Sequence, residues 1–279
     1  MRGDPARLLP ALREAVAEAG ERILEVYRRD FQVQDKADGT PLTEADRAAH
    51  EWLLKRLSRL TPDWPVLSEE SEAVPHAVRR HWDRYWLVDP LDGTREFIQR
   101  NGEFTVNVAL VAAGRPVLGV VGAPVLDRVY AGLLGQGAWR AEGEAPPEPI
   151  RVRSYRGGPP VVVASRSHRG PALEGYLARL GEALGGYRTR ACGSSLKFCL
   201  VAEGEADVYP RLGPTSEWDT AAAQCVVEAA GGRVVDFHGR PLAYNKPNLL
   251  NPWFVASGAG AMDWTRFAPA DGGGSSPPT

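Results

Sequence analysis

The sequence predicts an α+β first half followed by an α/β second half, and three observations indicate this. Two apolar stripes at helical spacing occupy the first sixty residues. Short apolar runs separated by Gly and Pro follow them. Beyond residue 150, strand-like and helix-like segments alternate, which is typical of α/β architecture.

The two helices expected first are amphipathic. Residues 5–29 form one of them, with apolar side chains at helical spacing: Leu8, Leu12, Val16, Ala19, Ile23 and Val26. The other begins at Thr43, which can cap its N-terminus because acidic Asp46 follows three positions later. Pro62 ends this second helix.

The following apolar runs predict a mostly antiparallel sheet, with strands at residues 65–67, 85–88, 104–112, 117–121 and 129–133. Residues 141–149 are rich in Glu, Gly and Pro and are typical of a linker. We therefore expect a first half at residues 1–145 and a second half at 146–270. The Gly-, Ser- and Pro-rich tail at 271–279 is expected to be disordered.

In the second half, residues 161–163 predict a buried strand. Helices are expected at residues 173–184, 195–201 and 217–230, because apolar side chains recur there at helical spacing.

Composition and charge exclude several classes of protein. The 279 residues include 33 Lys and Arg against 35 Asp and Glu, a net charge of -2 without a polybasic run, so a nucleic acid polymer is not an expected partner. No apolar stretch reaches the ~18 residues of a membrane span, and the first ten residues lack the apolar core of a signal peptide. A cytoplasmic protein without a membrane partner is expected, and a homodimer is a candidate assembly.

Three cysteines, Cys192, Cys199 and Cys225, form no C-x-x-C pair. Their odd number and spacing argue against a disulfide framework and against a thiolate zinc site. We expect three thiols that pack in the interior.

Acidic residues gather where an apolar strand ends. Asp89 and Asp92 follow the run Trp-Leu-Val at residues 86–88, with Pro90 between them and Gly93 after them. Such a segment is by itself most typical of a turn. Two further acids suggest a function: Glu69 ends the preceding strand, and Asp219 lies in the first turn of a later helix.

These four carboxylates fit a hard divalent cation such as Mg²⁺, which takes oxygen ligands and leaves positions open for water and substrate. Pro90 fixes the backbone between the two aspartates, so the carbonyl of Leu91 can also turn toward a metal. The backbone N–H groups of Gly93 and Thr94 suit a phosphate oxygen.

Two other interpretations of these acids need comparison. An EF-hand loop needs alternating acids and Gly at its sixth position, whereas here the acids are three apart and Gly is fifth. A haloacid-dehalogenase-like phosphatase has a strand followed by D-x-D-G-T, but two residues separate Asp89 from Asp92. The EF-hand is rejected, and the aspartyl-phosphate chemistry is the second-ranked alternative.

The motif D-P-L-D-G-T after W-L-V, with L-S-E-E upstream and W-D-T-A-A downstream, resembles the inositol monophosphatase superfamily of metal-dependent, lithium-sensitive phosphatases. The resemblance spans most of the chain. Residues 95–110 and 193–204 are similar to the CysQ branch of that superfamily, the 3'(2'),5'-bisphosphate nucleotidases. Arg95 departs from this branch, which usually has Lys at that position.

The resemblance implies a layered αβαβα sandwich with the active site between the halves. It implies Glu69, Asp89, Asp92, Asp219 and the Leu91 carbonyl as metal ligands. Asp46, in a T-x-x-D segment, would position a nucleophilic water together with Thr94. The expected catalytic residues are Asp46, Glu69 and Thr94, and the expected substrate-binding residues are Asp92, Gly93, Thr94, Gly193, Ser194 and Asp219.

Some assignments have alternatives. Glu70 competes with Glu69 as the ligand, and an acid at position 46 is also stabilised by the helix dipole alone. Gly193, Ser194 and Ser195 suit either a helix N-cap or a ribose or phosphate oxygen. Lys197 either reaches a second phosphate or flanks a helix, the surface position being favoured. Arg166, after the strand at residues 161–163, is a candidate nucleotide contact.

The function expected from all this is a Mg²⁺-dependent phosphatase acting on a small phosphorylated substrate. The 3'-phosphate of adenosine 3',5'-bisphosphate is the first candidate, attacked directly by water without a covalent intermediate. Inositol monophosphate and a sugar bisphosphate are alternatives. A phosphometabolite-binding protein without turnover is a further one, although crowded carboxylates without a metal would repel one another.

Overall fold

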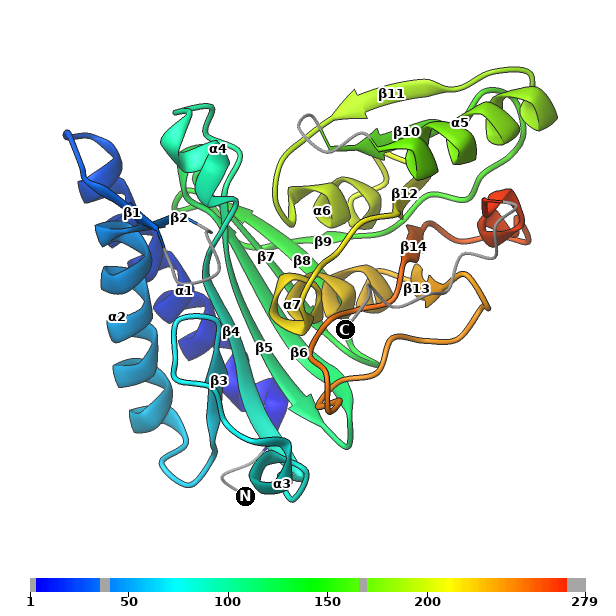
Figure 1. Ribbon diagram of the computed structural model, residues 1–279. Helices are drawn as coiled ribbons and strands as arrows, with labels where there is room; N and C mark the ends of the chain where they lie inside the picture. Colours follow the sequence, from blue (N-terminus) through cyan, green and yellow to red (C-terminus); the bar gives the residue numbers. More distant parts are fainter. Residues whose placement is uncertain (1–3, 36–40, 166–169, 270–279) are drawn as a thin grey trace.

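A computed structural model describes residues 4–35, 41–165 and 170–269. The chain forms five layers, in the order helices, sheet, helices, sheet, helices (Figure 1). This confirms the expected αβαβα sandwich.

The larger sheet has seven strands in the order β3-β4-β5-β6-β7-β8-β9, and all neighbours are antiparallel except β3 and β4. Its strands are β3 (Val66–Ser68), β4 (Arg84–Asp92), β5 (Thr105–Ala112), β6 (Arg115–Ala123), β7 (Arg128–Leu133), β8 (Gly137–Glu142) and β9 (Glu148–Ile150). The parallel pairing brings the ends of β3 and β4 to the same edge, where the Glu69 N–H donates to the Val88 carbonyl at 3.1 Å, next to Asp89. The mostly antiparallel sheet predicted from the sequence is confirmed.

Two long helices cover the outer face of this sheet: α1 (Pro5–Tyr27) and α2 (Glu44–Leu60) (Figure 1). Apolar side chains such as Leu12, Ile23 and Leu53 are fully buried against the sheet, which explains the helical spacing in the sequence. A capping box of Thr43 and Asp46 begins α2, as predicted. The short hairpin of β1 (Val33–Asp35) and β2 (Pro41–Thr43) precedes α2.

The middle layer contains α6 (Leu196–Ala202) and α7 (Glu217–Ala229). Glycines let α7 lie close to the large sheet: a Cβ at Gly119 would stand 2.3 Å from the Ala222 carbonyl oxygen, and one at Gly132 2.6 Å from the Val226 Cα. Close packing fixes the direction in which the N-terminal end of α7 points.

The smaller sheet has the order β11-β10-β12-β14-β13, with β10 parallel to β11 and β12 and the remaining pairs antiparallel. Its strands are β10 (Val161–Ala164), β11 (Arg188–Ala191), β12 (Val208–Arg211), β13 (Arg233–Asp236) and β14 (Phe254–Ser257). Helix α5 (Pro171–Leu184) and the 3-10 helix η2 (Trp264–Phe267) cover its outer face. Three short helices are also present in the described chain: α3 (His76–Arg79), α4 (Thr94–Ile98) and the 3-10 helix η1 (Pro124–Leu126).

The linker-like segment at residues 141–149 contains the turn between two paired strands. Ala141 belongs to β8, and Pro149 belongs to β9, which pairs antiparallel with it. The division expected between residues 145 and 146 therefore falls inside a hairpin of the large sheet, and the two-domain division stays a prediction. The tail expected to be disordered lies outside the described residues.

Cys192, Cys199 and Cys225 are all free and buried, as expected. Burial raises the pKa of the Cys192 thiol to about 11. Among the described helices, none combines the length and apolar character that a membrane crossing requires.

Candidate active site

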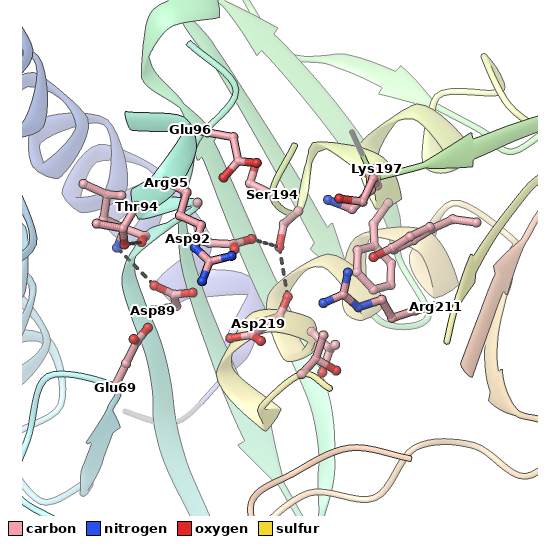
Figure 2. A pocket seen from close by; sticks show the side chains of 18 of the residues that line it. Glu69, Asp89, Asp92, Thr94, Arg95, Glu96, Ser194, Lys197, Arg211 and Asp219 are labelled. Carbon is pink, nitrogen blue, oxygen red and sulfur yellow. Dashed lines mark hydrogen bonds between the residues drawn. The ribbon is translucent and has the colours of Figure 1, made fainter. Parts of the chain in front are cut away.

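A cavity of about 260 Å³ opens where the two sheets meet α6 and α7, and acidic side chains from three elements line it (Figure 2). Glu69 follows β3, Asp89 lies on β4, and Asp219 lies in the first turn of α7. One carboxylate oxygen from each of these three residues lies within 4.8 Å of the other two. Asp92, at the end of β4, lines the same cavity.

The end of β4 folds so that its polar groups face this cavity. Pairing with β5 is irregular between Asp89 and Asp92. The N–H of Leu91 donates to Asp89 Oδ1 at 3.1 Å, and the Leu91 carbonyl oxygen lies 3.4 Å from the Thr94 hydroxyl oxygen. Gly93 has a φ of 92°, a conformation that favours glycine, and this turn begins α4.

Asp46 supports this turn from behind and is not among the residues that line the cavity. It is 2% exposed, and its Oδ2 accepts from the backbone N–H and the hydroxyl of Thr43 at 2.7 and 2.6 Å. Its Oδ1 lies 3.4 Å from the Thr94 hydroxyl, which donates toward it. Asp46 therefore caps α2 and contacts Thr94 at once.

Burial and mutual repulsion raise the pKa values of acidic residues in the cavity. Burial raises the pKa of Asp89 well above its usual range, with Glu69, Asp92 and Asp219 adding to the effect. Burial and the charge of Asp92 raise the pKa of Asp219 to about 8. Carboxylates held this close are stabilised in their charged form by a cation among them.

Asp92 connects the large sheet to the start of α6. The hydroxyl of Ser195, the residue before α6, lies 2.8 Å from Asp92 Oδ2 and 2.9 Å from the carbonyl oxygen of Asp219. The Asn107 amide on β5 donates to Ser195 Oγ at 3.0 Å. From the sequence, Ser195 was a candidate for a helix N-cap or for a contact to a ribose or phosphate oxygen, whereas Asn107 had no assigned site role. The two residues come together only when β4, β5 and α6 pack against one another.

Gly193 and Ser194 differ in their surroundings. Ser194 lines the cavity, with a positive φ of 42°. Gly193 does not line it, and its N–H donates to Glu103 Oε2 at 2.8 Å. A Cβ at Gly193 would stand 2.6 Å from the Glu103 carbonyl oxygen. Gly193 thus brings the chain close to Glu103, and its N–H is engaged there.

Lys197 and Arg211 stand on the other side of the cavity, whereas a third basic lining residue, Arg95 on α4, is drawn on the same side as Asp89 and Asp92 (Figure 2). Lys197 on α6 is 6% exposed and lines the cavity, with its Nζ 5.6 Å from the centre of the Tyr209 ring. Tyr209 and Arg211 are two positions apart on β12, so their side chains lie on the same face of the strand. Both line the cavity. The surface position favoured for Lys197 was wrong, because α6 turns this side chain inward. Figure 2 shows Lys197 and Arg211 across from the acidic group.

Of the adjacent glutamates, Glu69 lines the cavity and belongs to the three-carboxylate group. Glu70 is absent from the described lining. Burial lowers the pKa of His50 on α2, and the charge of Glu70 partly offsets this. Glu70 therefore lies near α2. Arg166, the candidate nucleotide contact, lies outside the described residues.

Fold and site together define a metal-dependent phosphatase, with acids from the large sheet and from α7 around a cavity between two halves. The sequence profile of the inositol monophosphatase family matches residues 4–258. The chain belongs to this family. Membership excludes the haloacid-dehalogenase-like alternative, whose motif spacing this chain also lacks.

Relatives within the family carry a more specific name. The 3'(2'),5'-bisphosphate nucleotidase CysQ of Escherichia coli strain K12 is 52% identical over 242 residues, covering 86% of this chain and 95% of the relative. The protein of that name from Salmonella typhimurium is 53% identical over 239 residues, with 85% and 94% covered. The crystal structure of CysQ from Bacteroides thetaiotaomicron superposes with a TM-score of 0.78 at 44% identity, covering 89% of this chain and 97% of that one.

Proposed function

We propose that this protein is a Mg²⁺-dependent phosphatase that removes the 3'-phosphate of adenosine 3',5'-bisphosphate. The observation that carries the proposal is the cavity itself, with Glu69, Asp89 and Asp219 on one side and Lys197 and Arg211 on the other. Relatives about half identical in sequence, named 3'(2'),5'-bisphosphate nucleotidases, support the same substrate class.

The donor set fits a hard divalent cation. Its three converging side chains are carboxylates, and in the described chain neither His nor Cys joins them. Oxygen ligands of this kind suit Mg²⁺. The Leu91 carbonyl and Asp92 lie at the same end of β4 and would complete the ligand set. When bound, Mg²⁺ would polarise the phosphoryl group, activate water and stabilise the leaving oxygen.

Thr94 and Asp46 would orient the attacking water. The Thr94 hydroxyl donates toward Asp46 Oδ1, so its oxygen lone pairs are free to accept a hydrogen bond from water. Asp46 Oδ1 would then hold the proton that passes through Thr94 as water attacks. The N–H groups at Gly93 and Thr94, at the start of α4, lie next to the acids and would bind a phosphate oxygen.

Two phosphates on one substrate match the two sides of the cavity. A phosphate bound among the acids would need metal to offset repulsion, whereas Lys197 and Arg211 attract an anion directly. This arrangement favours a bisphosphate over inositol monophosphate, which would leave the basic side unused. A sugar bisphosphate is the closest competitor, and the aromatic ring of Tyr209 beside Lys197 favours a substrate with a planar base.

Phosphate release from a panel tests the proposal: adenosine 3',5'-bisphosphate, inositol monophosphate and fructose bisphosphate, each with Mg²⁺. We expect the highest kcat/KM for the adenosine compound. Lys197→Met should raise its KM by about tenfold, the order of a charge-assisted contact, and should affect inositol monophosphate little.

Lys55→Met is the matched control, because Lys55 is exposed on α2. A higher kcat/KM for inositol monophosphate or fructose bisphosphate would overturn the substrate assignment. Tight binding of the panel without any turnover would replace the enzyme by a binding protein.

A further inference from the structure

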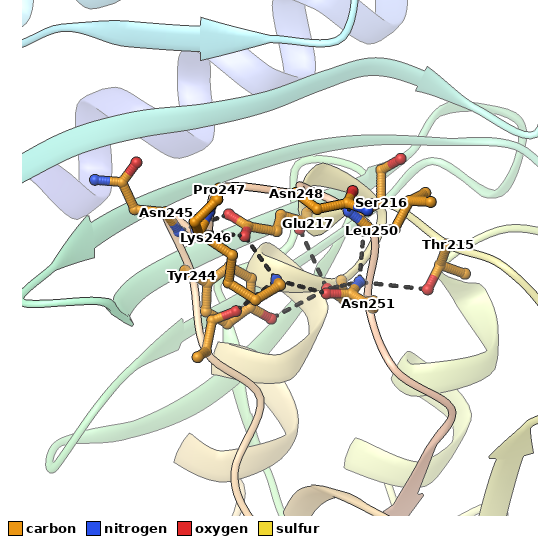
Figure 3. Close-up of polar contacts among 12 residues, drawn as sticks. Thr215, Ser216, Glu217, Tyr244, Asn245, Lys246, Pro247, Asn248, Leu250 and Asn251 are labelled. Carbon is orange, nitrogen blue, oxygen red and sulfur yellow. Dashed lines mark hydrogen bonds and ion pairs between the residues drawn. The ribbon is translucent and has the colours of Figure 1, made fainter. Parts of the chain in front are cut away.

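A network of buried polar groups surrounds the N-terminal end of α7, outside the cavity (Figure 3). We call it the polar clamp, and it consists of Arg79, Glu217, Asn245, Lys246 and Asn251. Arg79 belongs to α3, which follows the segment carrying Glu69. Glu217 begins α7, and the other three lie in the connection between β13 and β14.

Glu217 is the centre of the polar clamp and is completely buried. Its Oε1 accepts from Lys246 Nζ at 2.6 Å and from the Lys246 backbone N–H at 3.0 Å. Its Oε2 accepts from the Asn245 N–H at 2.7 Å. A buried charge with this many donors is fully compensated, so the connection between β13 and β14 is tied to the first residue of α7.

Asn245 extends the network to α3. Its φ of 66° is left-handed, which Asn tolerates better than most residues. Its Oδ1 accepts from Arg79 Nη1 at 3.0 Å, and its Nδ2 donates to the Arg79 carbonyl at 2.6 Å. Arg79 is 2% exposed and also donates to the Pro247 carbonyl at 2.9 Å. Asn245 thus joins α3 to α7, because its side chain contacts Arg79 and its backbone N–H donates to Glu217.

Asn251 secures the other flank of the same turn. Its N–H donates to the Thr215 carbonyl at 2.7 Å, and its side-chain amide donates to the Ser216 carbonyl at 2.7 Å. The Ser216 N–H in turn donates to Asp219 Oδ2 at 2.9 Å. The orientation of the Asp219 carboxylate therefore depends on a turn that Asn251 and Glu217 fix from both sides.

We infer that the polar clamp is a positioning device for the metal site, which keeps Asp219 on α7 in register with Glu69 at the end of β3. This inference rests on the proposed function. The two carboxylates come from separate elements and repel each other, so contacts elsewhere in the fold must hold them against that force. The clamp joins α7, through Glu217, to α3, through Arg79, and α3 follows the segment that carries Glu69.

The burial of Glu217 indicates that the polar clamp positions Asp219 rather than simply adding to the stability of the fold. The ion pair between buried Glu217 and half-buried Lys246 adds little net stability over apolar side chains, because desolvation of Glu217 offsets the attraction. Its directional hydrogen bonds instead specify one geometry. That geometry is the one in which the three carboxylates converge.

The test measures divalent metal binding directly, by calorimetry with Mg²⁺ and by electron paramagnetic resonance with Mn²⁺, without substrate. Two variants are used. Glu217→Gln keeps the shape and removes the charge, and Asn245→Gly keeps the left-handed backbone but deletes both side-chain contacts to Arg79. We expect each to weaken metal affinity by about tenfold, the lower end for partners that orient ligands.

Glu203→Gln is the matched control. Glu203 has a side chain that is 6% exposed and an ion pair with Arg140 at 3.0 Å, but it contacts none of the clamp residues in the described hydrogen bonds. It should lower Tm and leave metal affinity unchanged. In activity assays, the rate deficit of the clamp variants should shrink as Mg²⁺ approaches saturation.

Lower Tm in Glu217→Gln and Asn245→Gly with wild-type metal affinity would overturn the inference and leave the proposed function intact. A wild-type protein that binds neither Mg²⁺ nor Mn²⁺ would instead overturn the metal site of the proposed function and the clamp's role with it. If Glu217→Gln does not fold, Asn245→Gly alone decides between these outcomes.

Discussion

The hydroxyl of Ser195 lies 2.8 Å from Oδ2 of Asp92, joining the start of α6 to the end of β4 across the cavity. Ser195 is 1% exposed, so water cannot readily replace this contact. The position of Asp92 at the end of β4 therefore depends on a residue at the start of α6, 103 positions later in the chain.

Ser195→Ala should lower kcat/KM for the preferred phosphate ester by about tenfold, the cost of leaving a half-buried carboxylate without one hydrogen-bond donor. Steady-state kinetics at saturating Mg²⁺ measures this. Ser58→Ala is the control, because Ser58 is exposed on α2 and bonds only to the Lys55 carbonyl among the described contacts. Equal kinetics in the two variants would mean that the contact with Asp92 is not needed.

Glu69→Gln and Glu70→Gln separate the adjacent glutamates. Removing a metal charge required in the transition state should reduce kcat by at least about 100-fold in Glu69→Gln. Glu70→Gln should stay within about threefold, since Glu70 is not among the described lining residues. The opposite order would assign the ligand to Glu70 and require the end of β3 to be rearranged.

The acidic group predicts a pH dependence of stability in the metal-free protein. The folded-state pKa of Asp219 is raised to about 8, and that of Asp89 is also raised. Between about pH 4, the pKa of unfolded Asp, and about pH 8, the folded state binds more protons than the unfolded state. The contribution of Asp89 and Asp219 to the free energy of unfolding is therefore fully present below this window and is lost as pH rises through it.

We accordingly expect Tm of the metal-free protein to decrease from pH 5 to pH 8, and Mg²⁺ to reduce this decrease. Magnesium binding at pH 7 should also release protons, because the ligands must ionise. Calorimetry in two buffers of different ionisation enthalpy counts these protons. Identical heats in both buffers, together with a Tm that does not change with pH, would contradict the assignment.

Lithium should inhibit turnover at Mg²⁺ concentrations that support it. A small monovalent ion can occupy a carboxylate and phosphate oxygen site yet supplies less charge to the leaving oxygen. Sodium chloride at matched ionic strength controls for screening of an anionic substrate. Equal inhibition by the two salts would show that at least one ligand of the metal site is assigned wrongly.

Local signals explain what could be predicted from the sequence. The capping box of Thr43 and Asp46 spans three residues, and the strand that ends in Asp89 and Asp92 is continuous in the chain. Both features can therefore be recognised from neighbouring residues alone. Glu69 and Asp219 are found by motif, and their carboxylates lie beside that of Asp89 in the folded chain.

Contacts between distant segments could not be predicted in the same way. Glu217 meets Lys246 across 29 positions, and Asn107 meets Ser195 across 88. Neither pair has a spacing that marks it as a contact. Strand β9 was missed because Glu, Gly and Pro surround it, and it forms only by pairing with β8.

One measurement tests whether a metal held by Asp89 and its neighbours is required for the reaction. Phosphate release by the metal-free protein is followed as Mg²⁺ is added back and is compared between wild type and Asp89→Asn. Adenosine 3',5'-bisphosphate is the substrate, and circular dichroism verifies the fold of both proteins. We expect the wild-type rate to rise from the background with Mg²⁺, while Asp89→Asn stays at least about 100-fold slower at every concentration. A wild-type rate independent of Mg²⁺, or activity of folded Asp89→Asn within about tenfold of wild type, would contradict this expectation.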